Sequence, residues 1–134
     1  MVDQGYSVDD LIDALVAVGL GKSDLVYMPS ALFSLGRMSN TPFDQIPEKI
    51  YDGVKEVIGV DGTLTVPAAF EDYARFGTPY DTRHSRVDPG QGAFSQYVNS
   101  LPNAWRSYCP LNAVSGIGPL AHEICHGWTA SSYG

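Results

Sequence analysis

The stretch Phe43–Pro67 reads FDQIPEKIYDGVKEVIGVDGTLTVP, and its two halves have different periods. Apolar residues recur every three or four positions over 43–58, which predicts an amphipathic helix ended by Gly59. The turn dipeptide Asp61-Gly62 follows, and the β-branched run 63–66 after it predicts a short strand. A helix that leads directly into a strand is the repeating unit of α/β folds.

The residues before this stretch have the same order of elements. Ser7-Val8-Asp9-Asp10 has the composition of a capping box, and apolar residues at helical spacing follow it, so a helix is predicted over 8–18. The apolar run Asp24–Met28, ended by a proline, predicts a short buried strand, and 30–36 a connecting loop. Strands that alternate with amphipathic helices favour parallel pairing through right-handed crossovers.

The second half of the chain begins with residues 68–91, which have no sustained period. Aromatic and basic side chains alternate there, and so long a connection is uncommon in a compact domain unless it binds something, which favours an ordered binding loop. The pattern then predicts a helix over 92–100, a strand over 113–117 and a helix over 119–126.

These elements predict an α/β fold, a layered α/β/α sandwich with a mostly parallel or mixed central sheet, formed by a single domain over 1–134. In this arrangement Val26 and Leu64 lie on adjacent buried strands. No internal repeat or low-complexity tract is present.

Composition restricts the class of protein. The net charge of −7 and the pI near 4.6 argue against a nucleic-acid partner and suit a cationic one, such as a polyamine or aminosugar. The sequence contains no long apolar run and does not begin like a signal peptide, so neither membrane insertion nor secretion is expected and a cytoplasmic location is predicted. Cys109 and Cys125 are then expected to be free thiols.

Four segments, in chain order, resemble those of the aminoglycoside 3-N-acetyltransferase family. Its motifs are His-Ser-Ser-Leu-x-x-Leu-Gly after a strand, Gly-x-x-Gly-Thr-Leu-x-x-Pro, Leu-Pro-Gly-x-x-Arg-Ser-x-His-Pro and Ser-Val-x-Ala-Ile-Gly-x-x-Ala. The matching segments here are Ser30–Gly36, Gly59–Pro67, Leu101–Pro110 and Ala113–Ala121. The matches extend from about Leu11 to Gly134 and correspond to the amino-terminal half of a typical member, so the fold is expected to be incomplete.

The resemblance implies an N-acyltransferase that moves an acetyl group from acetyl-CoA to an amine of an aminoglycoside, aminosugar or related small molecule, as in antibiotic resistance. It implies that the thioester end of the cofactor lies against backbone amides of the first and third segments. The cofactor-binding residues would be Ser30, Ala31, Leu32, Leu35, Gly36, Ser107, Tyr108, Ala113 and Val114, with Asp72 and Tyr73 facing the substrate.

The chain also departs from the family pattern. Pro29 and Cys109 stand where the family has histidines, and Ala113 replaces a serine. The family's general base, a histidine in a Thr-x-x-His motif, would lie beyond Gly134. Either another polypeptide supplies the missing carboxyl-terminal half, or the sequence is a fragment, or the chain is a non-catalytic remnant or a coenzyme A-binding module. The expected protein partner is this missing half or, as a homo-oligomer, a further copy of the chain.

Three further residue sets have alternative interpretations. Cys109 is either a buried structural cysteine or a nucleophile activated by a histidine. His122 and His126, four apart, are expected at the solvent side of a helix; they lack a third ligand at characteristic spacing, so no metal site is predicted. Arg106 either meets a phosphate or forms a surface ion pair. The last helix is expected to expose an apolar face that includes Ile124 and Trp128.

Overall fold

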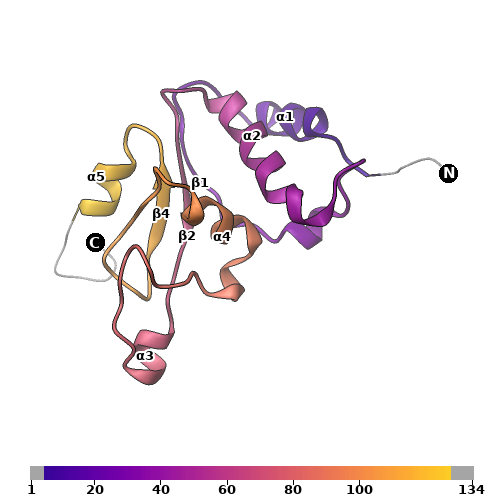
Figure 1. Ribbon diagram of the computed structural model, residues 1–134. Coiled ribbons are helices and arrows are strands. Elements are labelled where there is room, and N and C mark those ends of the chain that lie inside the picture. The colour runs from indigo at the N-terminus through magenta and orange to yellow at the C-terminus, as the bar shows by residue number, and fades with distance from the viewer. Residues whose placement is uncertain (1–4, 128–134) are drawn as a thin grey trace.

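A computed structural model describes residues 5–127 of the chain as an α/β structure with four strands and five α-helices. A mixed sheet forms the middle layer (Figure 1). Helices α2 and α4 lie on one face of it, with α1 outside α2, and α5 lies on the other face. The predicted layered α/β class is therefore confirmed. The elements are α1 (Val8–Ala17), β1 (Leu25–Tyr27), α2 (Ile46–Ile58), β2 (Thr63–Pro67), α3 (Asp72–Phe76), α4 (Ala93–Ser100), β3 (Trp105–Arg106), β4 (Val114–Ile117) and α5 (Ala121–His126).

The strand order is β1-β2-β4-β3. β1 and β2 are parallel, with Val26 opposite Leu64, as the helix–strand alternation predicted. β4 runs antiparallel to both of its neighbours, so the sheet is mixed, one of the two arrangements that the sequence predicted. The two-residue strand β3 was not predicted; it pairs with β4 as a hairpin, because the chain reverses between them.

Burial differs between the two parallel strands. Leu64 is fully buried, whereas Val26 is only half-buried, and Leu25 and Tyr27 on either side of it are more than half exposed. The prediction that β1 is a buried strand was therefore wrong, because β1 lies at the edge of the sheet and the described residues cover little of its outer side.

The core lies between β2, β4 and the helices α2 and α4. Helix α2 is amphipathic, and its apolar side packs on Leu64 and Val66 of β2 and on Phe94 and Val98 of α4. Burial of each such side chain stabilises the fold by about 1.5–3 kcal/mol. The buried residues of this cluster are Met38, Ile46, Ile50, Val54, Ile58, Leu64, Val66, Phe94, Val98 and Ile117.

Helix α1 begins with the predicted capping box. The Asp10 amide donates to Ser7 Oγ at 3.0 Å, and the Ser7 amide donates to a carboxylate oxygen of Asp10 at 2.9 Å. The helix packs against α2 at Gly53, where a Cβ atom would lie 3.3 Å from a methyl group of Leu11. A residue with no side chain in the middle of α2 thus lets the two helices approach closely.

Residues 68–91 are ordered, but they contain two short helices that the sequence did not predict: α3 and the 3₁₀ turn Pro89–Gln91. Helix α5 lies against the other face of the sheet at Gly116, where a Cβ atom would meet Ala121 at 3.4 Å. Ile124 of this helix is half-buried, not exposed as predicted, and Trp128 lies outside the described residues. Within residues 5–127, no helix is both long enough and apolar enough to cross a membrane.

Candidate functional site

Three strands have their carboxyl ends at the same end of the sheet. This end, perpendicular to the strands, is called the sheet edge below. β1 and β2 are parallel, and both β2 and β3 are antiparallel to β4, so β1, β2 and β3 point the same way. Their following loops, and the start of β4 at Val114, therefore lie along one edge. Ligand sites in layered α/β folds form at such edges.

The loop after β1 contains the first group of predicted cofactor residues. The short 3₁₀ helix Leu32–Leu35 begins after Ala31 and ends at Gly36, which has a φ of 81°. The amide groups of Ala31, Leu32 and Phe33 donate no hydrogen bond to any described residue. The hydroxyl oxygen of Ser30 is buried and likewise has no partner in that part of the chain. The loop thus offers unused donors at the sheet edge.

Gly92, at the start of α4, lies close against this loop. It has a φ of 96°, and a Cβ atom there would lie 2.9 Å from the carbonyl oxygen of Ser30. Only glycine allows both the backbone conformation and the close approach.

The second group of predicted cofactor residues lies between β3 and β4. Ser107 donates its amide to the carbonyl of Val114 at 2.9 Å, and the Val114 amide donates to Ser107 Oγ at 3.0 Å. Ala113 is buried, and its carbonyl accepts from the amide of Ala68 at 2.7 Å. Tyr108 is more than half exposed. The Ser107 amide is therefore already used within the sheet, while Tyr108 faces solvent.

The two groups stand at opposite sides of the sheet edge. β1 and β3 are the outer strands of four, and adjacent strands are about 4.8 Å apart, so the two loops are separated by roughly 14 Å. A ligand that contacts both groups must therefore be long.

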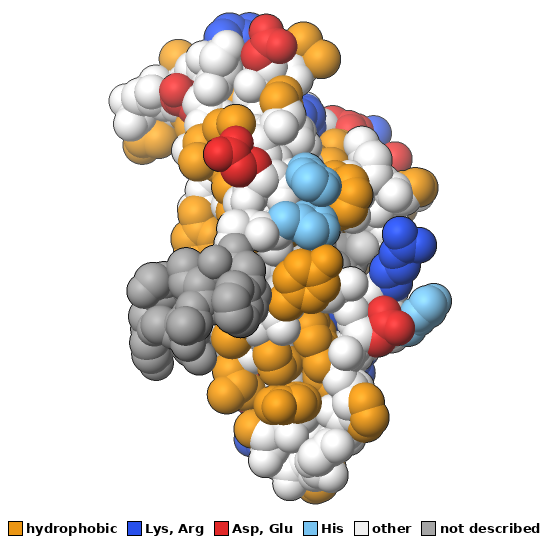
Figure 2. All heavy atoms as spheres, turned by 90° about the vertical axis from the view of Figure 1, so that its left-hand side faces the viewer, with side chains coloured by type: hydrophobic (Ala, Val, Ile, Leu, Met, Phe, Trp, Pro, Cys, Tyr) orange, Lys and Arg blue, Asp and Glu red, His pale blue; other side chains and the backbone are white. Residues whose placement is uncertain are grey.

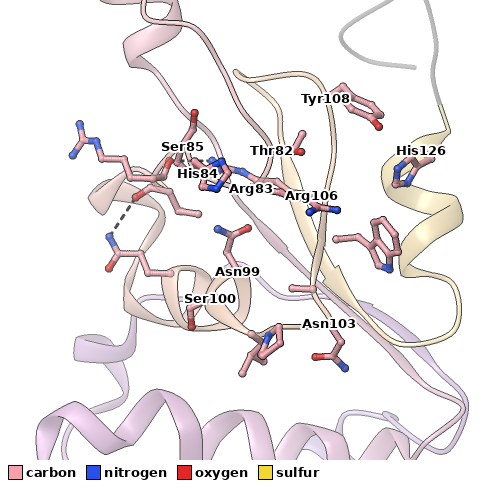
Figure 3. A pocket seen from close by; sticks show the side chains of 17 residues that line it. Thr82, Arg83, His84, Ser85, Asn99, Ser100, Asn103, Arg106, Tyr108 and His126 are labelled. Atoms are coloured by element: carbon pink, nitrogen blue, oxygen red, sulfur yellow. Dashed lines mark hydrogen bonds between the residues drawn. The ribbon is translucent and has the colours of Figure 1, made fainter.

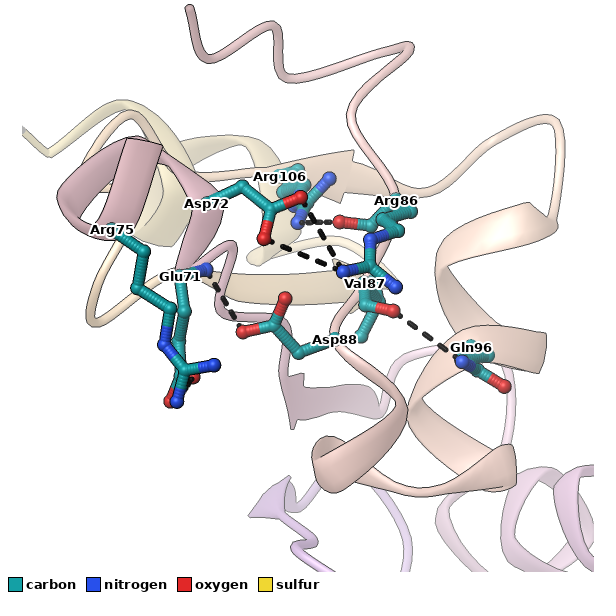
Figure 4. A network of polar contacts seen from close by, with 8 residues as sticks. All are labelled: Glu71, Asp72, Arg75, Arg86, Val87, Asp88, Gln96 and Arg106. Atoms are coloured by element: carbon teal, nitrogen blue, oxygen red, sulfur yellow. Dashed lines mark hydrogen bonds and ion pairs between the residues drawn. The ribbon is translucent and has the colours of Figure 1, made fainter. Parts of the chain in front are cut away.

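Arg106 proves to be a buried anchor, so both predictions for it, a phosphate contact and a surface ion pair, were wrong. Only 5% of the residue is exposed, and its guanidinium donates to the carbonyls of Ala68, Ser85 and Arg86. Figure 4 shows the contact with Arg86. It also lies over the ring of Tyr80, 5.1 Å from the centroid. Burial lowers the pKa of Arg106. Its four hydrogen bonds to carbonyl oxygens all go to the loop of residues 68–91.

Tyr80 and Asp88 complete this anchoring, and the sequence did not single them out for it. The Tyr80 hydroxyl donates to the carbonyl of Ser107 at 2.6 Å, and burial raises the pKa of Tyr80 to about 12. The buried Asp88 accepts from the amide of Glu71 at 2.9 Å. The binding loop predicted over 68–91 is thus fixed at both ends to the sheet edge.

The predicted substrate residues lie on α3. Asp72 accepts from Arg86 at 3.4 Å, and Tyr73 is about half exposed. Both belong to the loop that Arg106 and Asp88 hold in place, but Asp72 is shared with an arginine.

The two cysteines are free thiols. Cys109 is half-exposed and makes no hydrogen bond with a histidine of the described chain: His84 bonds to Asp81, and His126 to the carbonyl of His122. Cys125 is buried against the carbonyl of Val114, and burial raises its pKa to about 11. The contacts needed for an activated cysteine nucleophile are not present in residues 5–127.

His122 and His126 stack on each other with ring centroids 4.1 Å apart. Trp105 of β3 meets both rings edge-on, at 4.6 and 5.0 Å. Figure 2 shows two imidazoles side by side on the face that carries α5, with hydrophobic side chains next to them. In the described residues no group of three or more potential metal ligands occurs.

A cavity of about 900 Å³ lies beside β3 (Figure 3). Asn99 and Ser100 reach it from α4, and His126 from α5 at the opposite side. Residues 82–87 and Tyr108 complete much of its wall. The cavity therefore adjoins the second group of predicted cofactor residues.

Comparison with known proteins agrees with this arrangement. The family model described as aminoglycoside 3-N-acetyltransferase matches residues 28–134. The aminoglycoside N(3)-acetyltransferase VIII of Streptomyces fradiae is 28% identical over 136 residues, which cover 88% of this chain and 46% of that protein.

Solved structures show the same fold. The acetyltransferase AAC-VIa bound to sisomicin superposes with a TM-score of 0.80 at 20% identity, over 96% of this chain and 52% of that one. AAC-IIIb in a binary complex with CoASH gives 0.77 at 20% identity, over 92% and 50%. The chain thus spans about half the length of the relatives it matches. Since the family model covers most of the sequence, this chain belongs to the aminoglycoside 3-N-acetyltransferase family.

Proposed function

We propose that this chain is the coenzyme A-binding part of an N-acyltransferase, which acetylates an amino group of an aminoglycoside, an aminosugar or a related small molecule. One observation supports this most directly: the loops after β1 and β3 and the start of β4, which hold the residues implied by the family motifs, meet at a single sheet edge. A cytoplasmic location remains part of the proposal.

The residues at this edge fit a thioester donor. The amides of Ala31, Leu32 and Phe33 and the hydroxyl of Ser30, which have no partner within residues 5–127, suit the carbonyl groups of a pantetheine arm. The roughly 14 Å between the two loops suits an elongated ligand. Leu32 and Leu35 would pack on the apolar part of the arm.

When bound, acetyl-CoA supplies an acetyl group as a thioester. The amine nitrogen forms a bond to the acetyl carbon, the carbon–sulfur bond breaks, and the amine loses a proton while the thiolate departs. Backbone amides aimed at the thioester oxygen stabilise the negative charge that develops there. The amides of the Ser30–Gly36 loop are the candidates for this role in the described chain.

The acceptor is expected to be cationic. A net charge of −7 attracts amines at long range, and AAC-VIa, which shares this fold, was solved with sisomicin. Asp72 and Tyr73 of α3 present a carboxylate and an aromatic ring at the loop of residues 68–91. They would bind the ammonium group of the acceptor.

A second candidate is a coenzyme A-binding module without catalysis. The sequence of 134 residues contains no Thr-x-x-His motif, which the family uses for its general base. Both candidates predict binding of coenzyme A, and only the first predicts release of its thiol when an amine is added.

Both candidates predict that the chain binds coenzyme A. Calorimetric titration of the chain with coenzyme A, up to millimolar concentration, tests this prediction. Leu35→Glu places a charge on the half-exposed wall of the loop and is expected to weaken binding about tenfold, because the ligand is anionic. Val60→Glu is the matched control, since Val60 is 85% exposed and precedes β2 at the opposite edge. Equal affinity in the two variants, or no binding at all, would refute the proposal.

A thiol-release assay then separates the two candidates. Acetyl-CoA is incubated with the protein and an aminoglycoside, and the free thiol is measured with a chromogenic disulfide. Release that depends on the amine supports the acyltransferase, whereas binding without release supports the module.

A further inference from the structure

Arg86 stands between the acceptor site proposed on α3 and the cavity beside β3. Nη2 of its guanidinium lies 3.4 Å from each carboxylate oxygen of Asp72 (Figure 4). The same arginine lines the cavity, whereas Asp72 does not. One cationic side chain thus faces two places that can each hold a charged group.

The backbone of Arg86 is fixed, but its side chain is not. The Arg86 carbonyl accepts from Nη2 of the buried Arg106 at 3.0 Å, which holds the main chain in place. The side chain is 57% exposed, and within residues 5–127 it bonds only to Asp72. An ion pair this long and this open to water contributes little to stability. A competing anion can therefore draw the guanidinium away at small cost.

The cavity favours such an anion. The protein has a net charge of −7, yet in the part of the chain that the structure describes no aspartate or glutamate lines this cavity. Its basic lining residues are Arg83, His84, Arg86, Arg106 and His126. The guanidinium of Arg83 makes no hydrogen bond or ion pair with any described residue. Arg83 and Arg86 are therefore available for charge-assisted hydrogen bonds to anionic oxygens.

The pairing with Arg86 weakens Asp72 as a binding group for cations. The guanidinium lies against both carboxylate oxygens and offsets their charge. If Arg86 turns to the cavity, Asp72 is left as an unpaired carboxylate whose side chain is only 25% exposed. An ammonium group can then take the place of the guanidinium, beside the half-exposed ring of Tyr73.

We propose that Arg86 couples the two places: an anion bound in the cavity draws its guanidinium from Asp72, and the freed carboxylate binds the cationic acceptor more tightly. The inference rests on the proposed function, which assigns Asp72 to the acceptor. The coupling is reciprocal, because each ligand raises the affinity for the other by the same factor. The acceptor is therefore expected to prefer a chain that already holds an anion.

Calorimetric titration with sisomicin, without and with saturating inorganic pyrophosphate, measures this coupling. Sodium chloride keeps the ionic strength constant, so that screening is equal in the two titrations. Pyrophosphate is expected to raise the affinity for sisomicin about fivefold, and sisomicin should raise the affinity for pyrophosphate by the same factor. An unchanged or lowered affinity would overturn the proposal, and so would the failure of either probe to bind.

Arg86→Gln separates this coupling from direct attraction between the bound anion and the bound cation. Without the guanidinium Asp72 is always unpaired, so sisomicin should bind about fivefold more tightly than to the parent protein, and pyrophosphate should add nothing further. A pyrophosphate effect as large as in the parent protein would refute the role of Arg86. Because the Arg86 side chain is more than half exposed, its replacement is not expected to unfold the protein, and thermal denaturation checks this.

Two other arginines provide matched controls. Arg75→Gln removes the same charge from α3, but Arg75 pairs with Glu71 and does not line the cavity, so the fivefold coupling should remain. Arg83→Gln removes a contact to the anion that does not touch Asp72. Pyrophosphate should bind this variant more weakly, yet at saturation it should raise the affinity for sisomicin as in the parent protein. Loss of the coupling in Arg75→Gln would contradict the assignment to Arg86.

The outcomes separate this inference from the proposed function. If Leu35→Glu weakens the binding of coenzyme A while sisomicin binds equally well with and without pyrophosphate, the coupling is refuted and the proposed function stands. If pyrophosphate raises the affinity for sisomicin through Arg86 in a chain that does not bind coenzyme A, the coupling is supported and the proposed function is contradicted.

Discussion

Arg106 donates to the carbonyl oxygen of Ala68 through both Nε, at 3.1 Å, and Nη2, at 2.6 Å. This fork ties β3 to the residue that directly follows β2, across β4. The remaining donors reach Ser85 and Arg86, so one side chain fixes three places in the loop of residues 68–91.

Replacement of Arg106 by methionine should therefore destabilise the protein by about 3 kcal/mol, because three carbonyl oxygens lose a charged donor in a buried place. Urea denaturation followed by circular dichroism measures this. Arg75→Met removes an exposed arginine with one long ion pair and should cost less than about 0.5 kcal/mol. A similar loss in the two variants would show that Arg106 is not the anchor.

Gly92→Ala should destabilise the protein by about 1–3 kcal/mol, because the φ of 96° is strained for alanine and the new methyl group would press on the Ser30 carbonyl. Gly90→Ala, two residues away, provides the comparison. No atom lies within 4 Å of a Cβ atom placed there, and its φ is not in the left-handed region. Thermal melts of the two variants should differ by several degrees, and identical melting temperatures would contradict the close approach.

The two thiols should differ in reactivity. Cys125 is 2% exposed with a pKa of about 11, against an ordinary value of 9.0, so it stays protonated in the folded protein at neutral pH. A thiol reagent should modify one cysteine in the native state and two in denaturant, and none in native Cys109→Ser. Rapid modification of two native thiols would contradict the burial.

The raised pKa of Cys125 also predicts that the protein loses stability at high pH. The folded state holds this proton more tightly than the unfolded state does. The contribution of this protonated thiol to the free energy of unfolding is therefore complete below about pH 9, and it is lost as the pH rises toward 11. The midpoint of urea denaturation should fall over this interval. In the Cys125→Ala variant this midpoint should fall less steeply than in the parent protein.

Asp72→Asn should have little effect on stability, about 0.5 kcal/mol, because its contact with Arg86 is long and partly exposed. If Asp72 binds the ammonium group of the acceptor, the same change should lower the affinity for an aminoglycoside without changing the affinity for coenzyme A. Calorimetry with each ligand separates the two effects. Loss of coenzyme A affinity alone would place Asp72 at the donor side instead.

The extent to which the sequence predicts this fold depends on how local each signal is. The helices α1 and α2 are predicted because caps and apolar spacing lie within the elements themselves. β3 has only two residues and α3 only five, and contacts made elsewhere in the chain hold both. Their formation depends on tertiary pairing, which no local pattern contains.

The site shows the same contrast. Motif resemblance points to the loops after β1 and β3, and the topology places both at one edge. The role of Arg106 could not be predicted, since its acceptors stand 20 to 38 positions away along the chain. A charged residue next to a serine gives no sign that backbone carbonyls will surround it.

The strand order has a kinetic consequence. The central pair joins Leu64 to Ile117, more than fifty residues apart, whereas the β3–β4 hairpin joins Arg106 to the nearby Ser115. Closing the longer loop costs entropy before any contact compensates for it, so docking of β2 on the hairpin is expected to limit the rate of folding. Substitutions between β2 and β4 should therefore slow refolding.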